Sequence, residues 1–183
     1  MSRWNIANGL TGVRLVLVPV FGWLLLSGEG TEYRAAAAVV FVTAVLTDRL
    51  DGELARRRDL ITDLGKIADP IADKALIGMG LVGLSLLGEL SWWVTVVVAV
   101  REIGVTVMRL LVVRRVVLPA GRGGKAKTAL QALAVTGYVL PLPEVGHLAA
   151  VAVMALAVAV TVITGIDYAV QGVRVVRGTG RDR

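Results

Sequence analysis

The sequence predicts an all-α fold, a single membrane-embedded bundle of about six transmembrane helices with both termini in the cytoplasm. Hydrophobic residues make up 56% of the 183 residues, and the mean hydropathy of +0.73 is high for a soluble domain. Several apolar runs approach the roughly 20 residues that a helix needs to cross a hydrocarbon layer about 30 Å thick. Basic residues gather in alternate connections between these runs, as is typical of cytoplasmic loops.

Six apolar segments are expected to form the helices, at residues 10–26, 34–50, 69–87, 91–113, 128–140 and 148–170. The first is interpreted as a retained span, because no small-residue cleavage site precedes the polar stretch after it. No linker, repeat or change in composition divides the chain. Residues 1–183 are therefore expected to form one membrane domain.

The distribution of charge predicts which side of the membrane each connection occupies. The predicted cytoplasmic connections and tail contain Arg56, Arg57, Arg58, Lys66, Arg114, Arg115, Arg122, Lys125, Lys127, Arg174, Arg177, Arg181 and Arg183. The alternate connections, residues 27–33, 88–89 and 141–146, contain acidic residues and neither Lys nor Arg. Tryptophans mark the predicted outer interface: Trp23, Trp92 and Trp93. This pattern predicts a multi-pass protein of the cell membrane.

Composition also excludes several kinds of site. Without cysteine, the chain has no disulfide, thiolate metal site or cysteine nucleophile. The single histidine, His147, lies in a predicted outer connection and is expected to face solvent. The net charge of +6 comes from residues between apolar spans, so membrane lipids with anionic headgroups, and not nucleic acid, are the expected partners.

Four aspartates form the most unusual feature of the sequence. Asp48 and Asp51 are three residues apart at the inner end of the second segment, and Asp69 and Asp73 are four apart at the inner start of the third. These spacings place each pair on one helical face. Carboxylates packed in a low dielectric repel one another unless cations neutralise them, and oxygen ligands suit hard divalent ions. The pattern predicts a divalent-metal site on the cytoplasmic side.

Structural alternatives exist for two of these aspartates. Asp69 precedes Pro70, so it could be the N-cap of the third helix. Asp51 could instead pair with a neighbouring arginine at the membrane rim. Asp73 lies about 6 Å further into its segment than Asp69, at a depth where ionisable groups are usually functional.

Two small residues accompany the aspartates. Gly52 follows Asp51, and Ala55 lies three residues further along. Missing side chains beside acidic ligands leave room for a nucleotide against the helix backbone. Packing of the small residues against a neighbouring helix is the alternative.

Eight positions within 26 residues match the signature of the CDP-alcohol phosphotransferase family, D-x2-D-G-x2-A-R-x8-G-x3-D-x3-D, without departure: Asp48, Asp51, Gly52, Ala55, Arg56, Gly65, Asp69 and Asp73. The resemblance implies transfer of a phosphatidyl group from a CDP-linked lipid to an alcohol, with release of CMP. It implies a homodimer with two divalent ions, Mg²⁺ or Mn²⁺, at a cytoplasmic site.

The resemblance also implies roles for the matching residues. Asp48, Asp51 and Asp69 correspond to metal ligands, and Asp73 corresponds to the general base, which also contacts metal. The positions that correspond to the binding site of the CDP-linked lipid are Gly52, Ala55, Arg56 and Gly65.

Segments outside the signature predict the acceptor alcohol. Residues 5–14, 99–103 and 124–131 are similar to segments of the bacterial phosphatidylglycerophosphate synthases, with Ala7 and Val100 as departures. Four cations near one cytoplasmic end suit a dianionic phosphate on the acceptor: Arg101, Arg109, Lys125 and Lys127. The expected substrates are CDP-diacylglycerol and glycerol 3-phosphate.

Alternatives remain for these cations and for the acceptor. Lys125 and Lys127 could reflect only the positive charge of cytoplasmic loops, and Arg101 could form an intramembrane pair with Glu102. Inositol phosphate would suit the same cations, and a cardiolipin synthase would use phosphatidylglycerol as acceptor. A divalent-cation transporter is the alternative of another class, and it predicts carboxylates spread through the depth of the membrane.

Overall fold

The residues that the structure describes form six α-helices and contain no β-strand. The computed structural model describes the backbone of residues 6–28, 30–58, 63–112 and 122–178, and the side chains of residues 12–28, 30–47, 72, 74–108, 124 and 126–171. The helices are α1 (Ile6–Ser27), α2 (Thr31–Arg58), α3 (Asp63–Leu86), α4 (Trp92–Val112), α5 (Arg122–Val139) and α6 (Glu144–Gly178). The predicted all-α class is confirmed.

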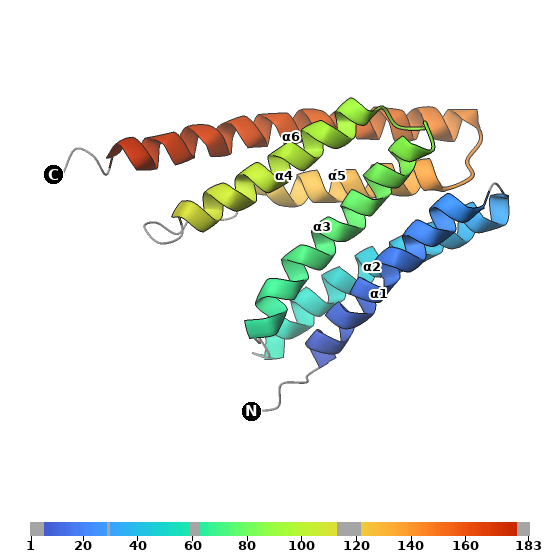
Figure 1. Ribbon diagram of the computed structural model, residues 1–183, viewed down its shortest axis with the longest axis horizontal. Helices are drawn as coiled ribbons and strands as arrows, with labels where there is room; N and C mark the ends of the chain where they lie inside the picture. Colours follow the sequence, from blue (N-terminus) through green and yellow to red (C-terminus); the bar gives the residue numbers. More distant parts are fainter. Residues whose placement is uncertain (1–5, 29, 59–62, 113–121, 179–183) are drawn as a thin grey trace.

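The helices form two groups, one of α1, α2 and α3 and the other of α4, α5 and α6 (Figure 1). In the first group, α1 packs against α2 and α3. In the second, α6 packs against α4 and α5. Contacts of α5 with α2 and α3, and of α3 with α4, connect the groups. Gly88, with φ of +74°, makes the tight turn between α3 and α4 because glycine adopts positive φ without steric cost.

Most helices continue beyond the apolar segments that predicted them. Several basic residues expected in connections lie on helices instead, so that assignment was wrong: Arg56, Arg57, Arg58, Lys66, Arg122, Lys125, Lys127, Arg174 and Arg177. His147 likewise lies in the first turn of α6, where it is exposed as expected. An apolar run indicates only the part of a helix that lipid or core surrounds, whereas Arg, Lys, Glu and Ala also favour helix and extend it.

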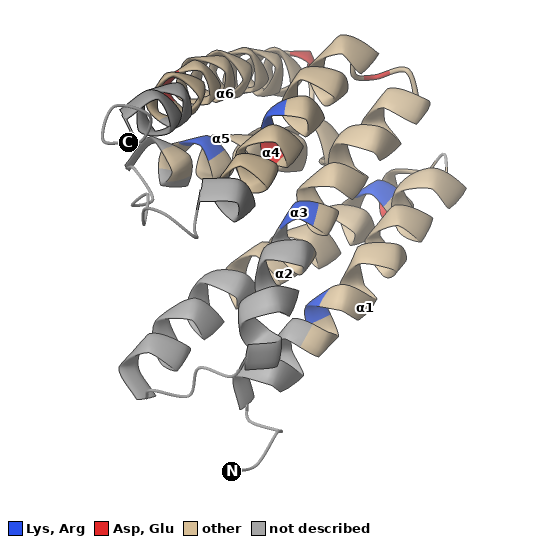
Figure 2. Cartoon of the chain, turned by 60° about the vertical axis from the view of Figure 1, so that its left-hand side comes forward, with Lys and Arg blue, Asp and Glu red and all other residues tan. Residues whose placement is uncertain are grey.

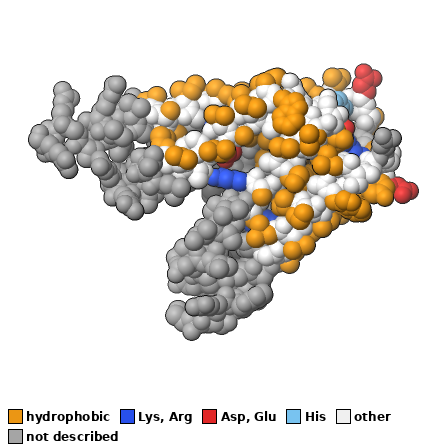
Figure 3. All heavy atoms as spheres, in the orientation of Figure 1, with side chains coloured by type: hydrophobic (Ala, Val, Ile, Leu, Met, Phe, Trp, Pro, Cys, Tyr) orange, Lys and Arg blue, Asp and Glu red, His pale blue; other side chains and the backbone are white. Residues whose placement is uncertain are grey.

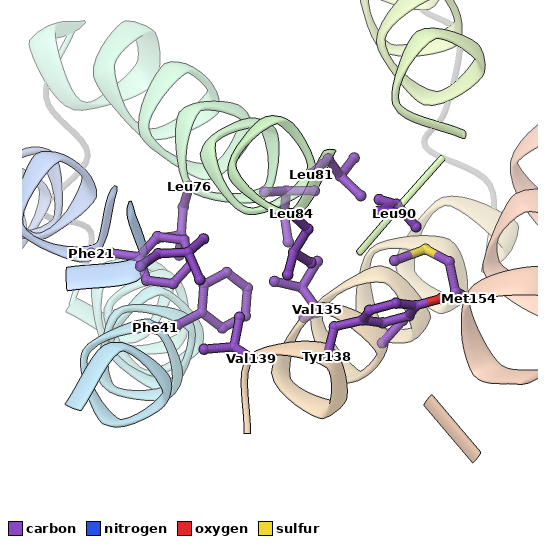
Figure 4. Close-up of a cluster of buried hydrophobic side chains, with 14 of the residues drawn as sticks. Phe21, Phe41, Leu76, Leu81, Leu84, Leu90, Val135, Tyr138, Val139 and Met154 are labelled. Carbon is purple, nitrogen blue, oxygen red and sulfur yellow. The ribbon is translucent and has the colours of Figure 1, made fainter. Parts of the chain in front are cut away.

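The hydrophobic core takes buried side chains from all six helices, and α1, α2, α3 and α5 supply its largest part (Figure 4). Its fully buried side chains include Phe21, Leu25, Phe41, Leu76, Leu84, Val135 and Val139. The rings of Phe21 and Phe41 pack at 5.0 Å between centroids. This core fixes α2 and α3 against each other, and those two helices carry the four aspartates.

The outward surface of the bundle is also strongly apolar (Figure 3). Large exposed side chains lie on α4 and α6, among them Val96, Val100, Ile103, Leu156, Ile163 and Ile166. One described segment, Glu144–Gln171 of α6, is long and apolar enough to cross a membrane, with a mean hydropathy of 2.5. Gly12–Ser27 and Lys74–Leu86 are apolar but shorter.

The bundle end remote from the aspartates is closed by an arginine. Arg34, near the start of α2, donates to Glu89 at 2.6 Å and to the backbone oxygen of Tyr138 at 3.0 Å. A cation at the C-terminal end of a helix, here α5, interacts favourably with the helix dipole. Arg34 thus ties α2 to the α3–α4 turn and to the end of α5.

Glycines allow α3 to approach its neighbours closely, and Gly80 provides a test. A Cβ at Gly80 would lie 2.7 Å from Val135 Cγ1, so Gly80→Ala is expected to destabilise the bundle by about 1–3 kcal/mol through overpacking. Thermal unfolding in detergent measures the loss. The double variant Gly80→Ala/Val135→Ala should recover part of it, and equal melting temperatures of Gly80→Ala and wild type would contradict this account of the contact.

Candidate active site

The four aspartates lie on two helices that pack against each other. Asp48 and Asp51 are on the last three turns of α2, and Asp69 and Asp73 are on the first three turns of α3. On a helix, residues that are three or four positions apart lie on the same face. The two helices are in contact, and the prediction that the four carboxylates form one acidic site stays a prediction.

The side chains of the signature residues lie outside the described residues. Their contacts, including any metal coordination, therefore stay predictions. This applies to Asp48, Asp51, Gly52, Ala55, Arg56, Gly65, Asp69 and Asp73. The side chains of Arg109 on α4 and Lys125 on α5 also lie outside the described residues.

The backbone does exclude one alternative. Because α3 begins at Asp63, Asp69 lies within the second turn of the helix. An N-cap residue precedes the first helical residue. The interpretation of Asp69 as the N-cap of this helix was therefore wrong, and capping does not explain the aspartate.

A cluster of charged side chains lies on the neighbouring helices α4 and α5. The carboxylate of Glu102 accepts a hydrogen bond from Arg101 Nη1 at 3.1 Å and forms an ion pair with Lys127. The side chains are largely buried, with 11% of Arg101, 21% of Glu102 and 5% of Lys127 exposed. The pair of Arg101 with Glu102 that the sequence left open is thus present. It also brings two of the four predicted acceptor cations to one carboxylate.

Lys74 connects this charged cluster to the aspartate-bearing segment of α3. It follows Asp73 directly in the sequence, and its ammonium group donates a hydrogen bond to Thr106 Oγ1 on α4. Thr106 Oγ1 in turn donates to the backbone oxygen of Glu102 at 2.7 Å. The helix that carries Asp69 and Asp73 is therefore in polar contact with the helix that carries Arg101. Figure 2 shows basic positions, in blue, on α3, α4 and α5.

A cavity of about 220 Å³ lies between α3, α4 and α5. Lys74, Glu102 and Lys127 line its polar end. It continues past Ile77 and Val98 to Val82 and Thr95, about 12 Å along α3 at 1.5 Å per residue. The cavity thus combines a charged end near Asp73 with an apolar interior, which suits a small anion or the polar end of a lipid.

Two further helices supply polar side chains to this region. Gln131 on α5 lines the cavity and donates to Thr161 Oγ1 on α6 at 3.2 Å. Arg101 Nη2 donates to Thr164 Oγ1 at 3.1 Å, and its guanidinium lies 5.7 Å from the ring centre of Tyr168. Arg14 on α1 is 1% exposed, as expected only for a guanidinium that has partners within the bundle.

The predicted site residues did not include Thr106, Gln131, Thr164 or Tyr168, and the sequence left open whether Arg14 and Lys74 contact substrate. Their shared signal is a polar side chain on the inner face of an apolar helix, which is costly unless it has a partner. On α6 the signal is a spacing: Thr161, Thr164 and Tyr168 differ by three and four residues. Such a stripe predicts a polar face, although not the residue that it contacts.

Comparisons with known proteins agree with this arrangement. Residues 4–163 match the sequence profile of the CDP-alcohol phosphatidyltransferase family. The chain is 53% identical to a probable phosphatidylglycerophosphate synthase of Mycobacterium tuberculosis over 176 residues, 95% of this chain and 84% of the relative.

Two further relatives differ in how much of the chain they match. A CDP-diacylglycerol–glycerol-3-phosphate 3-phosphatidyltransferase of Bacillus subtilis is 33% identical over 90% of this chain and 93% of its own length. A CMP-forming cardiolipin synthase of Streptomyces coelicolor is 41% identical over 57% of this chain and 49% of its own length. With its signature residues on α2 and α3 and a match over most of its length, the chain belongs to the CDP-alcohol phosphatidyltransferase family.

Proposed function

We propose that this enzyme transfers the phosphatidyl group of CDP-diacylglycerol to glycerol 3-phosphate, forming phosphatidylglycerophosphate and CMP in phospholipid biosynthesis. The observation that carries the proposal is the contact of Lys74 with Thr106, which brings the helix of Asp69 and Asp73 against the helix of Arg101. One site would then have an acidic half for the pyrophosphate of the CDP-lipid and a cationic half for a phosphorylated acceptor. The names of the relatives from M. tuberculosis and B. subtilis support this acceptor.

In the acidic half, the backbone arrangement fits a divalent-metal site. Asp48 and Asp51 share one face of α2, Asp69 and Asp73 share one face of α3, and the two helices are in contact. We propose Asp48, Asp51 and Asp69 as ligands of two ions, Mg²⁺ or Mn²⁺, with Asp73 able to contact them. A bound divalent ion would stabilise negative charge on the pyrophosphate and on departing CMP.

The nucleotide end of the CDP-lipid would lie along α2. Gly52 and Ala55 lie three residues apart on the helix and lack bulky side chains, so the nucleotide can approach the backbone. Arg56, in the same turn, would bind a phosphate oxygen. Gly65 on α3 would leave space opposite them, and these four positions form the proposed binding site for the CDP-lipid.

Asp73 would act as the general base. It would take the proton from the attacking hydroxyl of glycerol 3-phosphate while the hydroxyl oxygen forms a bond to the lipid-side phosphorus. The bond from that phosphorus to the bridging oxygen breaks, and this oxygen leaves with CMP. The proton remains on Asp73 until solvent removes it.

In the cationic half, Arg101 and Lys127 would bind the acceptor phosphate, assisted by Arg109 and Lys125. Among the described side chains of this cluster, Arg101 and Lys127 pair with the single carboxylate of Glu102, and Lys74 lines the same cavity as Glu102 and Lys127. That surplus of positive charge favours a dianion. Glu102 would keep the cations charged and close together in the absence of substrate.

We further propose that the six helices span the cell membrane, that both termini and the site face the cytoplasm, and that the enzyme is a homodimer. Exposed aliphatic side chains on α4 and α6 support burial in lipid. The connections at residues 27–33, 88–89 and 141–146 contain acidic residues, whereas basic residues accompany the aspartates in the sequence. This asymmetry supports a cytoplasmic location of the aspartate end. An even number of spans would then place both termini on the same side.

One experiment distinguishes the acceptors. Purified protein receives CDP-diacylglycerol and Mg²⁺ or Mn²⁺, with glycerol 3-phosphate, inositol phosphate or phosphatidylglycerol in separate reactions, and CMP release is measured. CMP is expected with glycerol 3-phosphate and in much smaller amounts with the others. Release with phosphatidylglycerol alone would assign a cardiolipin synthase, release with inositol phosphate alone would overturn the acceptor, and no release with any acceptor would overturn the enzyme.

A further inference from the structure

A polar stripe on α6 includes two residues, Thr164 and Tyr168, that contact Arg101. The stripe consists of Thr161, Thr164 and Tyr168, and it lies within the described segment that is apolar enough to cross a membrane. Thr161 is fully buried and Tyr168 is 6% exposed, whereas Ile163 and Ile166 face outward. The match to the family profile ends at residue 163, so Thr164, Gly165 and Tyr168, which contact Arg101, lie beyond the matched region.

Three residues of α6 hold the Arg101 side chain at different points. Thr164 Oγ1 accepts a hydrogen bond from Nη2 at 3.1 Å, and the ring of Tyr168 lies 5.7 Å from the guanidinium carbon. At Gly165, a Cβ would lie only 3.0 Å from Arg101 Cγ, so the aliphatic stem lies directly against the α6 backbone. We call Thr164, Gly165 and Tyr168 the α6 cradle.

The geometry of the cradle orients the guanidinium. The Thr164 hydroxyl donates its proton to the backbone oxygen of Val160 at 2.7 Å, so its oxygen lone pairs face Arg101 as acceptors. The Tyr168 ring attracts the cation through its π face. Glu102 binds Nη1 at 3.1 Å, and among the described residues Arg101 Nε is buried without a hydrogen-bond partner. Glu102 and Thr164 thus fix the two terminal nitrogens of the guanidinium, and Nε–H is left without a bond to a described residue.

We propose that the α6 cradle positions Arg101 to bind the phosphate of the acceptor. This inference rests on the proposed function and names residues that act through Arg101 and do not themselves touch substrate. A long side chain loses rotamer freedom when it binds a phosphate, and a side chain already held in place loses less. Loss of the cradle should therefore weaken binding of the acceptor and leave the CDP-lipid half of the site unchanged.

Paired substitutions test the cradle. Tyr168→Leu removes the π face and Thr164→Val removes the hydroxyl, whereas Tyr168→Phe and Thr164→Ser keep them. We expect Tyr168→Leu and Thr164→Val each to raise the KM for glycerol 3-phosphate about fivefold, on the order of 1 kcal/mol, with the KM for CDP-diacylglycerol little changed. The conservative variants should retain the wild-type KM, as should Ile166→Ala, which changes the outward face of the same helix.

A double-mutant cycle separates positioning from general packing. In an Arg101→Met background, Tyr168→Leu should cause no further rise in the KM for glycerol 3-phosphate. The cradle would be overturned if Tyr168→Leu raised this KM equally in the wild-type and Arg101→Met backgrounds. It would also be overturned if Tyr168→Leu raised the KM of both substrates to the same extent and Tyr168→Phe did not restore the wild-type values. If Arg101→Met raises the KM for glycerol 3-phosphate and neither Tyr168→Leu nor Thr164→Val does, the positioning role of the cradle is rejected and the proposed role of Arg101 remains. If Arg101→Met leaves the KM unchanged, the proposed role of Arg101 fails together with it.

Discussion

Replacing Asp73 with asparagine is expected to reduce CMP release by about a thousandfold, even at saturating metal and substrates. Asparagine has nearly the same shape and keeps one oxygen that can contact a metal ion, but it cannot accept the proton of the attacking hydroxyl. General bases contribute roughly 10²- to 10⁴-fold to enzyme rates, which sets the expected size. The measurement is initial-rate CMP release from CDP-diacylglycerol and glycerol 3-phosphate across a range of Mg²⁺ or Mn²⁺ concentrations.

Asp69→Asn is the matched control, because it makes the same chemical change four residues earlier on α3. We expect Asp69→Asn to raise the metal concentration needed for half-maximal rate, so that excess Mn²⁺ partly restores its activity but not that of Asp73→Asn. A second readout does not require turnover: Mn²⁺ should raise the melting temperature of Asp73→Asn nearly as much as that of wild type. Near-normal turnover would remove Asp73 as the base, and a lost metal-dependent shift would make it mainly a ligand.

The aspartate pairs could be predicted because their information is local. Residues three or four positions apart lie on the same face of any helix. The eight fixed positions of the signature also specify a family, and the profile match confirms that family. The same local pattern could not decide where α3 begins. The apolar run starts near residue 69, but the helix starts six residues earlier, at Asp63, and Leu64, Lys66 and Ala68 in this added stretch favour helix. Asp69 consequently changed from a possible cap to a residue inside the helix.

Contacts between helices could not be predicted in the same way. Lys74 reaches Thr106, 32 residues away, and Arg101 reaches Thr164, 63 residues away. Periodicity shows that a helix has a polar face, but the packing of the whole bundle decides what that face meets. Small residues such as Gly165, which brings α4 and α6 into close contact, control this packing, and a single glycine in an apolar helix has many possible explanations.

Removing the Lys127 charge is expected to have the second large effect, a rise in the KM for glycerol 3-phosphate of about 10- to 100-fold. Lys127 is buried and lines the charged end of the cavity, where a charge-assisted hydrogen bond to phosphate contributes roughly 1.5–3 kcal/mol. Lys127→Met removes the charge and keeps an unbranched side chain that is one heavy atom shorter. The KM for CDP-diacylglycerol should change far less, because that substrate is assigned to α2 and α3.

Arg122→Met is the control for this prediction, because it removes the same charge from α5 at the first residue of the helix. It should leave both KM values close to wild type. Equal effects of Lys127→Met and Arg122→Met would mean that Lys127 acts only through the overall positive charge of the cytoplasmic side. A large effect of Lys127→Met alone would instead favour direct binding of the acceptor phosphate. Both substitutions remove one positive charge from α5, but only Lys127 belongs to the buried cluster around Glu102.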